Sequence, residues 1–498
     1  MIACSLVVLG IWALASPPGS SPDDEFHLAS IWCATGVGSA TCPAGDSGAV
    51  LIPALIALPP NESKPCFAFH VETSGTCLFI GDTNRPLAHP ITRVNSGLYP
   101  PIYYRTLHSL VTPNALASAT AMRMFNVLVA VAMLFGTLAI ARPTLRRSLA
   151  LAALVTSIPL GLFIVASVNP SSWTYTGCLV AWAALLALGQ ATSARSRWLA
   201  GALYLIAGAI AVAARADGLA FIGVTTLAAI LASPDLRAWA WRQRIVVGSL
   251  IVVGLGLAAV LLGRVDQAQV AFGAQGTFQE GDSVTPVFER TFRVAVELPG
   301  YLAGSFGTWP LGQFDAPVPT SVWFIGVGLF LSLIMIGLGR SMPGKGWAVG
   351  LIAAAFVLIP LFILVRGGLY VGQSLQPRYL LPLLPALLGF SLLTRHPDEG
   401  LRLTASQRWV GIVGTTIAQS VALHFVLRRY ITGTDRPSWN LDYQWEWWWS
   451  WMPSPLTTWL IASLAFAYLA YRAFSLFASA GSSPSSATRA VPPPESVL

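Results

Sequence analysis

Apolar residues gather in long runs along this chain, and short polar segments separate one run from the next. An α-helix needs about 20 mostly apolar residues to cross a bilayer, and most of these runs come close to that length. The pattern therefore predicts an all-α polytopic membrane protein with about 12 transmembrane helices. The predicted spans cover residues 2–16, 117–141, 148–168, 174–190, 198–214, 219–232, 245–263, 321–339, 347–365, 379–393, 409–427 and 456–477.

The first run has a second interpretation, because a short apolar run near the start of a chain is also typical of a signal peptide. It lacks the basic residues that open such a signal, and the SPPGSS segment at 16–21 is a poor cleavage site. We therefore expect residues 2–16 to form an uncleaved helix.

Composition agrees with a membrane protein and excludes a soluble enzyme. Hydrophobic residues make up 55% of the 498 residues, charged residues only 10%, and the mean hydropathy is +0.65. A soluble domain carries about 25% charged residues. The net charge of +8 is spread singly over the ends of apolar runs, so it forms no patch for nucleic acid.

Basic residues in the short loops predict the orientation of the helices, because cytoplasmic loops carry an excess of Lys and Arg. By this rule both termini are cytoplasmic, and the segments 17–116, 264–319 and 428–455 lie outside the cytoplasm. We expect residues 1–477 to form a single transmembrane domain and 478–498 a disordered cytoplasmic tail. The residues assigned to the cytoplasmic side are Arg142, Arg146, Arg147, Arg195, Arg197, Arg237, Arg242, Arg244, Arg340, Lys345, Arg395, Arg402 and Arg408.

Four of the six cysteines lie in the first long segment, which suggests an oxidising compartment and two disulfides. The simplest pairing joins Cys33 to Cys42 and Cys66 to Cys77, although four cysteines allow three pairings. Helices lying along the membrane surface are expected in the AVLIPALIALPP run at 49–60 and the YPPIYYRTLHSLV run at 99–111. The mixed pattern at 287–307 predicts an interfacial or re-entrant helix.

The densest polar cluster is SPDDEFH, at residues 21–27, just beyond the first span. Ser21 or Asp23 could cap a helix whose first turn carries the acids, and a spacing of four residues puts Asp23 and His27 on one face. One interpretation is an acidic first turn stabilised by the helix dipole. The other is a general base, or a metal ligand, held at the membrane boundary.

Several arginines stand at the predicted outer ends of helices, against the usual charge bias. A bound phosphate would offset this charge, and Arg378 in LQPRYLLPLLP offers a planar fork suited to phosphate oxygens. The alternative for each is snorkelling or pairing with an outer acid. The set comprises Arg215 (near Asp217), Arg264, Arg366, Arg378, Arg428 and Arg429.

A tryptophan-rich run, WNLDYQWEWWWSW, fills residues 439–451. Trp collects at membrane interfaces because its ring is amphipathic, and this is the simpler interpretation. The same indoles, interleaved with Asp442 and Glu446, would also stack against the apolar faces of sugars. Both interpretations place the run at the outer surface.

Taken together, these motifs resemble the GT-C superfamily of membrane glycosyltransferases and, more closely, a bacterial family of predicted membrane proteins of unknown function. The resemblance rests on PDDEFH at 22–27, YPPIYY at 99–104, NPSSW at 169–173, GTWPLGQFDAPVP at 307–319, PRYLLPLLP at 377–385 and the tryptophan-rich run. It extends over most of the chain.

This resemblance implies an inverting transferase in the bacterial inner membrane, with its active site on the extracytoplasmic face. It would move a sugar from a polyprenyl-phosphate donor to an envelope glycan or glycolipid acceptor. The Asp-Asp-Glu run admits two registers, so the base is Asp23 with Asp24 beside it, or Asp24 with Glu25. The implied site comprises Asp23 and Asp24 as catalytic acids, Glu25 and His27 as supporting groups, Arg378, Arg366 and Arg215 for the donor phosphate, and Trp445, Trp447 and Trp309 for stacking on the sugar or acceptor.

Cofactor use stays open, because some members of that superfamily use a metal and others do not. A divalent cation (Mg²⁺, Mn²⁺ or Ca²⁺) would bind Asp23 and Asp24 if it takes part. The sugar, the acceptor and the oligomeric state also stay open.

Two other functions fit a protein with many spans. A transporter or flippase of lipid-linked precursors predicts ionisable residues in the spans, for which Arg123 and His424 are the candidates, and repeated halves, which the chain lacks. A noncatalytic scaffold of an envelope assembly complex predicts that the acidic cluster can be neutralised without loss of function.

Overall fold

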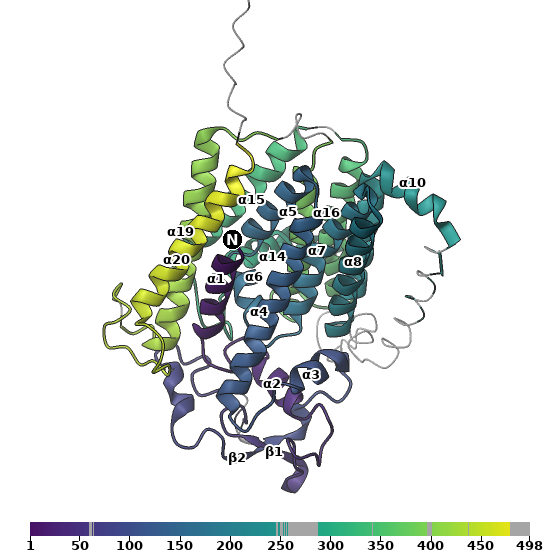
Figure 1. Ribbon diagram of the computed structural model, residues 1–498. Coiled ribbons are helices and arrows are strands. Elements are labelled where there is room, and N and C mark those ends of the chain that lie inside the picture. The colour runs from purple at the N-terminus through teal and green to yellow at the C-terminus, as the bar shows by residue number, and fades with distance from the viewer. Residues whose placement is uncertain are drawn as a thin grey trace, which may run out of the picture.

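The computed structural model describes residues 1–58, 62, 64–245, 248–249, 252, 254, 256, 287–340, 342–395, 401–436 and 438–478. Long helices form an upright bundle, and a smaller layer of loops, short helices and two strands covers one end of it (Figure 1). We call this end of the bundle the loop end. Within the described residues, six helices are long and apolar enough to cross a membrane, or seven if the bent pair α9 (Gly218–Ala232) and α10 (Pro234–Arg242) counts as one.

The other bundle helices correspond to the remaining predicted spans. The six long helices are α4 (Ala115–Ile140), α7 (Ser171–Gln190), α8 (Ala194–Ala214), α15 (Thr320–Leu338), α16 (Lys345–Arg366) and α19 (Ala405–Ile431). Beside them stand α1 (Ile2–Leu14), α5 (Pro143–Thr156), α6 (Leu160–Val165), α17 (Pro377–Leu380), η5 (Leu381–Leu383), α18 (Leu384–Leu392) and α20 (Pro455–Ser475). The predicted span at 245–263 lies largely outside the described residues. The prediction of a helical bundle is therefore confirmed, while the number of spans is not.

Two of the predicted spans are broken helices, and proline explains both breaks. Pro159 separates α5 from α6, and Pro382 and Pro385 lie where α17, η5 and α18 follow one another. Proline removes a backbone donor and clashes with the preceding turn, so a helix ends or changes geometry beside it. The second break matters for the site, because it separates the short α17, with Arg378, from the rest of its span.

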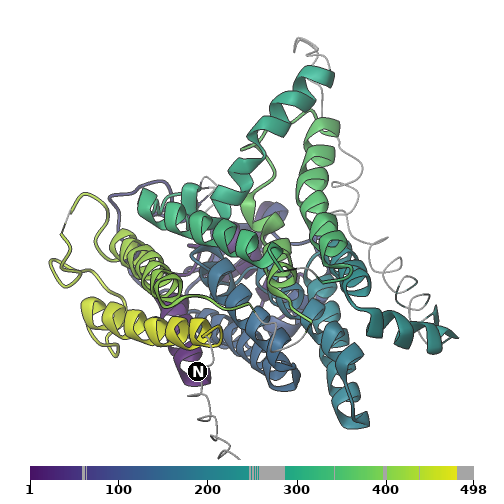
Figure 2. The same ribbon diagram turned by 90° about the horizontal axis from the view of Figure 1, so that it is seen from above.

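The centre of the bundle is α7, which is buried along nearly its whole length. It packs against α8, α9 and α4. At Gly177 a β-carbon would lie 2.3 Å from the carbonyl oxygen of Ala207, so only glycine allows α8 to approach this closely. Small residues at such contacts are typical of packing between membrane helices. At the other side of the bundle α20, in yellow, lies beside α1 and α19 (Figure 2).

The end opposite the loop end gathers the ends of helices that the charge pattern assigns to one side. Lys345 at the start of α16 donates hydrogen bonds from Nζ to the carbonyl oxygens of Gly337 in α15 (2.7 Å) and Leu393 after α18 (3.0 Å). The backbone N–H of Leu403, before α19, donates to the carbonyl oxygen of Phe477 (3.1 Å), after α20. The predicted grouping of these helix ends is confirmed. That this side is cytoplasmic stays a prediction.

At the loop end the first long segment contains α2 (Asp24–Trp32), α3 (Pro101–His108) and the strands β1 (Ala49–Pro53) and β2 (Pro86–Pro90). The strands pair antiparallel, with Val50 opposite His89. The expected helix in AVLIPALIALPP is therefore wrong and the class is not strictly all-α, since the start of that run forms β1. Val50 and Ile52 are buried, whereas the residues that alternate with them are half-buried, as in a strand with one face on the core. The helix predicted at YPPIYY is confirmed as α3. Both predicted disulfides, Cys33–Cys42 and Cys66–Cys77, are also confirmed.

The segment at residues 287–319 packs along the bundle and reaches the loop end after its last helical turn. It contains the amphipathic helix α13 (Val287–Glu297), then α14 (Pro299–Ala303) and a π-helical turn, η4 (Gly304–Thr308). Phe288 and Phe292, four residues apart, are 82% and 63% exposed on one face of α13. The helix predicted here is confirmed, and its position at the membrane interface stays a prediction.

Candidate active site

Asp23 lies at the point where the chain turns from α1 into α2. The backbone of Gly19 has a φ of +84°, and Asp23 itself has a φ of +61°, in the left-handed region that few residues other than glycine adopt. The predicted helix cap is wrong, because neither Ser21 nor Asp23 forms a side-chain hydrogen bond with the start of α2. The Asp23 carboxylate is thereby left to face another part of the chain. Strained backbone of this kind often marks functional sites.

The three neighbouring acids have three different environments. Asp24 is fully buried, and its carboxylate lies 3.3 Å from the guanidinium of Arg123 in α4 and accepts a hydrogen bond from the backbone N–H of Gly19 (2.9 Å). Arg123 also donates to the carbonyl oxygens of Ala13 and Ser16 at the end of α1. Burial raises the pKa of Asp24 to about 6, because its ionised form loses more hydration than Arg123 and Gly19 replace. Asp24 therefore joins α1, α2 and α4.

Glu25 is also buried and links separate segments of the loop end. Its carboxylate accepts hydrogen bonds from Lys64 Nζ (2.7 Å), Arg93 Nη2 (2.9 Å) and Gln313 Nε2 (2.8 Å). Gln313 in turn donates to the carbonyl oxygens of Gly19 (2.9 Å) and Ser21 (2.8 Å). The segment after η4 thus holds the turn that precedes Asp23.

Asp23 is the accessible member of the three acids, since 43% of its side chain is exposed, whereas Glu25 is 2% exposed and Asp24 is fully buried. Its carboxylate lies 2.5 Å from Nη2 of Arg378, which is 3% exposed. The same Nη2 donates to the hydroxyl of Tyr379 (3.0 Å), and Nη1 donates to the carbonyl oxygen of Pro22 (3.2 Å). Burial alone would raise the pKa of Asp23, but the Arg378 guanidinium, with smaller contributions from other neighbouring groups, holds that pKa below its usual value. Asp23 is therefore a partly exposed, ionised carboxylate beside a buried cation.

A second buried arginine also contacts Tyr379. Arg215, directly after α8, forms a two-pronged ion pair with Asp217 (3.0 and 2.6 Å), and its guanidinium lies 4.4 Å from the centre of the Tyr379 ring. The Arg378 guanidinium lies 5.0 Å from the same ring centre. We call Asp23, Arg215, Asp217, Arg378 and Tyr379 the Asp23 cluster. It brings two guanidinium groups, which suit phosphate oxygens, next to one exposed carboxylate.

His27 lies behind this cluster and has an aromatic environment. Its Nδ1 is 2.9 Å from the hydroxyl of Tyr104, and its ring centre is 5.3 Å from that of Tyr99. Burial lowers the pKa of His27 to about 3, so the imidazole is neutral at ordinary pH. The neutral ring therefore packs against the tyrosines beside the cluster.

The structure places the other predicted site residues at different distances from the cluster. Arg366 is exposed at the end of α16, with its guanidinium 5.8 Å from the ring of Phe362. Trp309 lies close to the cluster, since a β-carbon on Gly304 would touch both Trp309 and Pro377, the neighbour of Arg378. Trp445 and Trp447 pack against each other, with ring centres 6.2 Å apart.

The tryptophan-rich run also includes rings that hold the loop end together. Trp448 stacks on Phe79 at 5.8 Å, and the indole N–H of Trp449 donates to the carbonyl oxygen of Leu14 (3.0 Å). Among the contacts of the described residues, none joins this run to Asp23. These two indoles are therefore packing residues.

Several members of the site were not singled out from the sequence. Tyr379 and Tyr99 lie within the PRYLL and YPPIYY motifs, so proximity to those motifs was the available signal. Gln313, Lys64 and Arg93 carried no such signal, because only the folded chain brings 25, 64, 93 and 313 together.

The acids do not fit a shared metal site. A divalent cation needs several oxygen ligands that converge on one point. Asp24 and Glu25 instead face Arg123 and Lys64, while Asp23 faces Arg378. Within the described ranges no group of three or more His, Cys, Asp or Glu residues is placed to hold a metal ion.

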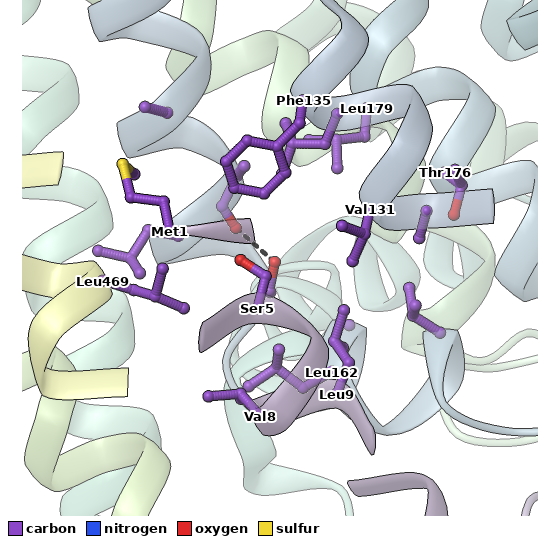
Figure 3. A pocket seen from close by; sticks show the side chains of 18 of the residues that line it. Met1, Ser5, Val8, Leu9, Val131, Phe135, Leu162, Thr176, Leu179 and Leu469 are labelled. Atoms are coloured by element: carbon purple, nitrogen blue, oxygen red, sulfur yellow. Dashed lines mark hydrogen bonds between the residues drawn. The ribbon is translucent and has the colours of Figure 1, made fainter. Parts of the chain in front are cut away.

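A separate, largely apolar cavity lies in the bundle, lined by α1, α4, α5, α6, α7 and α20 (Figure 3). Val8, Leu9, Val131, Phe135 and Leu179 point into it. The residues that α1 contributes come from its first eight, whereas Asp23 follows its other end. The cavity is therefore distinct from the Asp23 cluster.

Comparison with solved structures finds two crystal structures of ArnT from Cupriavidus metallidurans, one in the apo state and one bound to undecaprenyl phosphate. Each ArnT structure is 14% identical in sequence to this chain. The match covers 95% of this chain and 76% of the ArnT chain, with a TM-score of 0.44. A search of curated proteins finds no match.

The sequence itself matches the model of one protein family over residues 6–387, which is most of the chain. This range includes the acidic cluster, the YPPIYY and NPSSW motifs and the PRYLLPLLP motif. The resemblance to a family of predicted membrane proteins is thereby confirmed. The chain belongs to the family of predicted membrane proteins designated DUF2142.

Proposed function

We propose that this protein is a membrane glycosyltransferase that moves a sugar from a polyprenyl-phosphate donor to an envelope glycan or glycolipid acceptor. The observation that carries the proposal is the pairing of one partly exposed carboxylate, Asp23, with two buried arginines that share Tyr379. A glycosyl phosphate needs a base for the incoming hydroxyl and cations for the departing phosphate. The cluster offers both within one short range.

In this mechanism Asp23 accepts the proton of the acceptor hydroxyl. The acceptor oxygen forms a bond to the anomeric carbon while the bond from that carbon to the phosphate oxygen breaks, which inverts the anomeric configuration. The electron pair leaves with the polyprenyl phosphate, whose charge Arg378 and Arg215 stabilise. Of the two registers, the geometry favours Asp23, because Asp24 is sealed against Arg123 and is not exposed to an acceptor.

The ion pair between Asp23 and Arg378 gives donor binding a second effect. A phosphate that binds the Arg378 guanidinium competes with Asp23 for it. The pKa of Asp23 then rises toward its usual value, since the neighbouring cation is what lowers it. Donor binding thereby makes Asp23 a better base.

The proposal requires no divalent cation, because the buried guanidinium groups supply positive charge at the phosphate. It also places the loop end on the extracytoplasmic face of the inner membrane, where a lipid-linked donor is the available sugar source.

The residues that favoured a transporter have structural contacts at the loop end. Arg123 donates to the end of α1, and His424 Nε2 lies 3.0 Å from the carbonyl oxygen of Trp439, in the segment after α19. These contacts account for both side chains without a transport pathway, so the transferase remains the better-supported function.

The decisive experiment measures transfer of radiolabelled sugar from a panel of polyprenyl-phosphate donors by the purified full chain in detergent. We expect Asp23→Asn to lower the rate by at least about 100-fold, the usual contribution of a general base, while Asp46→Asn, an exposed acid of the same segment, leaves it unchanged. Added EDTA should have no effect. Full transfer by Asp23→Asn, with folding intact, would refute the proposal, and complementation of a deletion strain by that variant would favour the scaffold.

A further inference from the structure

A second pocket lies in the loop end, next to the Asp23 cluster. It has a volume of about 1000 Å³ and is lined by the end of α2 and the residues that follow it (33–36), the turn at residues 95–99 and α3. Pockets for small ligands usually measure about 300–1000 Å³, so this one is large enough for a disaccharide. We call it the α2–α3 pocket.

Hydrogen bonds hold the wall of this pocket in place. Asn95 accepts from the backbone N–H of Tyr99 (2.9 Å) and donates to the carbonyl oxygen of the same residue (3.0 Å). The backbone N–H of Asn95 donates to the hydroxyl of Ser30 in α2 (2.8 Å). The 95–99 turn is therefore fixed to α2, and the Tyr99 ring has a defined position before any ligand binds.

Polar, basic and apolar residues line the pocket, and none of them is an acid. Arg105 is exposed, and within the described part of the chain it has no acidic partner. His108 has a defined tautomer: its Nδ1 donates to the carbonyl oxygen of Ile31 (2.8 Å), because a carbonyl can only accept. Its Nε2 has no partner among the described residues. The pocket thus presents an unpaired cation to a ligand.

Two tyrosines connect the pocket with the Asp23 cluster. Tyr99 lines the pocket, and the guanidinium of Arg215 lies 5.9 Å from its ring centre. Tyr104 also lines the pocket, and its hydroxyl contacts His27, four residues after Asp23. The pocket therefore adjoins the Asp23 cluster through these two tyrosines.

We propose that the α2–α3 pocket binds the acceptor, and that this acceptor is a glycan bearing a negative charge, either a carboxylate or a phosphate, which pairs with Arg105. The inference rests on the proposed transferase function, because only a transferase has an acceptor. The preference of the pocket for an anionic glycan can nevertheless be measured without any donor.

The test measures binding of three disaccharides to the full chain in detergent: cellobiose, the same disaccharide with a carboxylate at its terminal C6 (cellobiouronic acid), and cellobiose 6′-phosphate. The probes share one skeleton, so a difference in affinity reports the charge, and comparison of the two anions distinguishes carboxylate from phosphate. Arg105→Gln is the test variant. Arg85→Gln is the matched control, since Arg85 is an exposed arginine of the same segment outside the pocket lining.

We expect at least one anion to bind the parent roughly tenfold more tightly than cellobiose, in line with a charge-assisted hydrogen bond at a partly exposed site. Arg105→Gln should remove this preference and leave cellobiose binding unchanged, and Arg85→Gln should behave as the parent. Equal affinity for all three probes, no binding of any probe, or a preference that survives Arg105→Gln would each overturn the inference. If the preference is observed while no sugar transfer depends on Asp23, the transferase proposal fails and the anionic glycan site stands.

Discussion

At the residue scale, three consecutive acids with the same chemistry have three roles, because each meets a different partner. Asp23 faces solvent and Arg378, Asp24 faces Arg123 in a dry environment, and Glu25 faces Lys64, Arg93 and Gln313. Their order along the chain does not distinguish their roles. Burial and the neighbouring cation do, since these decide which carboxylate is accessible and which serves packing.

Asp24 should make stability depend on pH in a specific direction. Its pKa is about 6 in the folded chain and 3.8 when exposed, so the folded state binds the proton more tightly. The free energy of unfolding therefore falls as pH rises from about 4 to about 6, by at most about 1.4 kcal/mol per pH unit. As pH rises over this window, the melting temperature of the parent should fall relative to that of Asp24→Asn. Above pH 7 the difference between the two melting temperatures should be constant.

The measurement is thermal unfolding of both proteins in detergent, followed by tryptophan fluorescence between pH 4 and 8. Asp46→Asn, at an exposed acid, serves as the control and should follow the parent. A parent that gains stability over Asp24→Asn between pH 4 and 6 would mean that Arg123 outweighs burial.

At the scale of elements, the Asp23 cluster depends on pieces that are far apart in the chain. The turn before α2 supplies Asp23, the end of α8 supplies Arg215, and the short α17 supplies Arg378 and Tyr379. Gln313, after η4, holds the turn through Gly19 and Ser21. Positioning by a separate segment makes this turn sensitive to changes outside it.

Gln313→Ala should therefore loosen the turn before α2 without unfolding the bundle. The side-chain amide of Gln313 donates to two carbonyl oxygens of the turn and to the Glu25 carboxylate, and it accepts from Lys64. The variant loses all four contacts. We expect faster hydrogen exchange in residues 19–27 and a rate of sugar transfer reduced by about tenfold, since small misplacements of catalytic groups are costly. Gln373→Ala, which removes only a local contact with Tyr370, should change neither. Unchanged exchange at 19–27 in Gln313→Ala would contradict this role.

At the scale of the whole molecule, the bundle separates two different ends. At one end, Lys345 and the contact between Leu403 and Phe477 connect the ends of neighbouring helices. The loop end carries the disulfides, the α2–α3 pocket and the Asp23 cluster. The charge pattern assigns the first end to the cytoplasm. Because disulfides form outside the cytoplasm, both observations predict the same orientation.

Labelling of single cysteines can test this orientation. In a chain with Cys4 and Cys178 replaced by serine, we expect a membrane-impermeant maleimide to label Asp46→Cys in intact spheroplasts. Thr192→Cys, in the exposed turn between α7 and α8, should react only after permeabilisation. The reverse pattern would place the Asp23 cluster in the cytoplasm and remove the argument for a lipid-linked donor.

The sequence by itself determined the properties that depend on local pattern. Apolar runs predicted the helices, because the bilayer sets their length, and cysteine spacing predicted both disulfides, because short loops close easily. The same reasoning singled out Asp23 as a candidate base and Arg378 and Arg215 as candidate phosphate-binding residues. It failed at residues 49–53, where pairing with a strand 37 residues further on selected β structure over a helix. Only the tertiary structure decided which acid is exposed, that Arg378 and Arg215 share Tyr379, and that Gln313 holds the turn, because each depends on contacts between segments that local pattern does not encode.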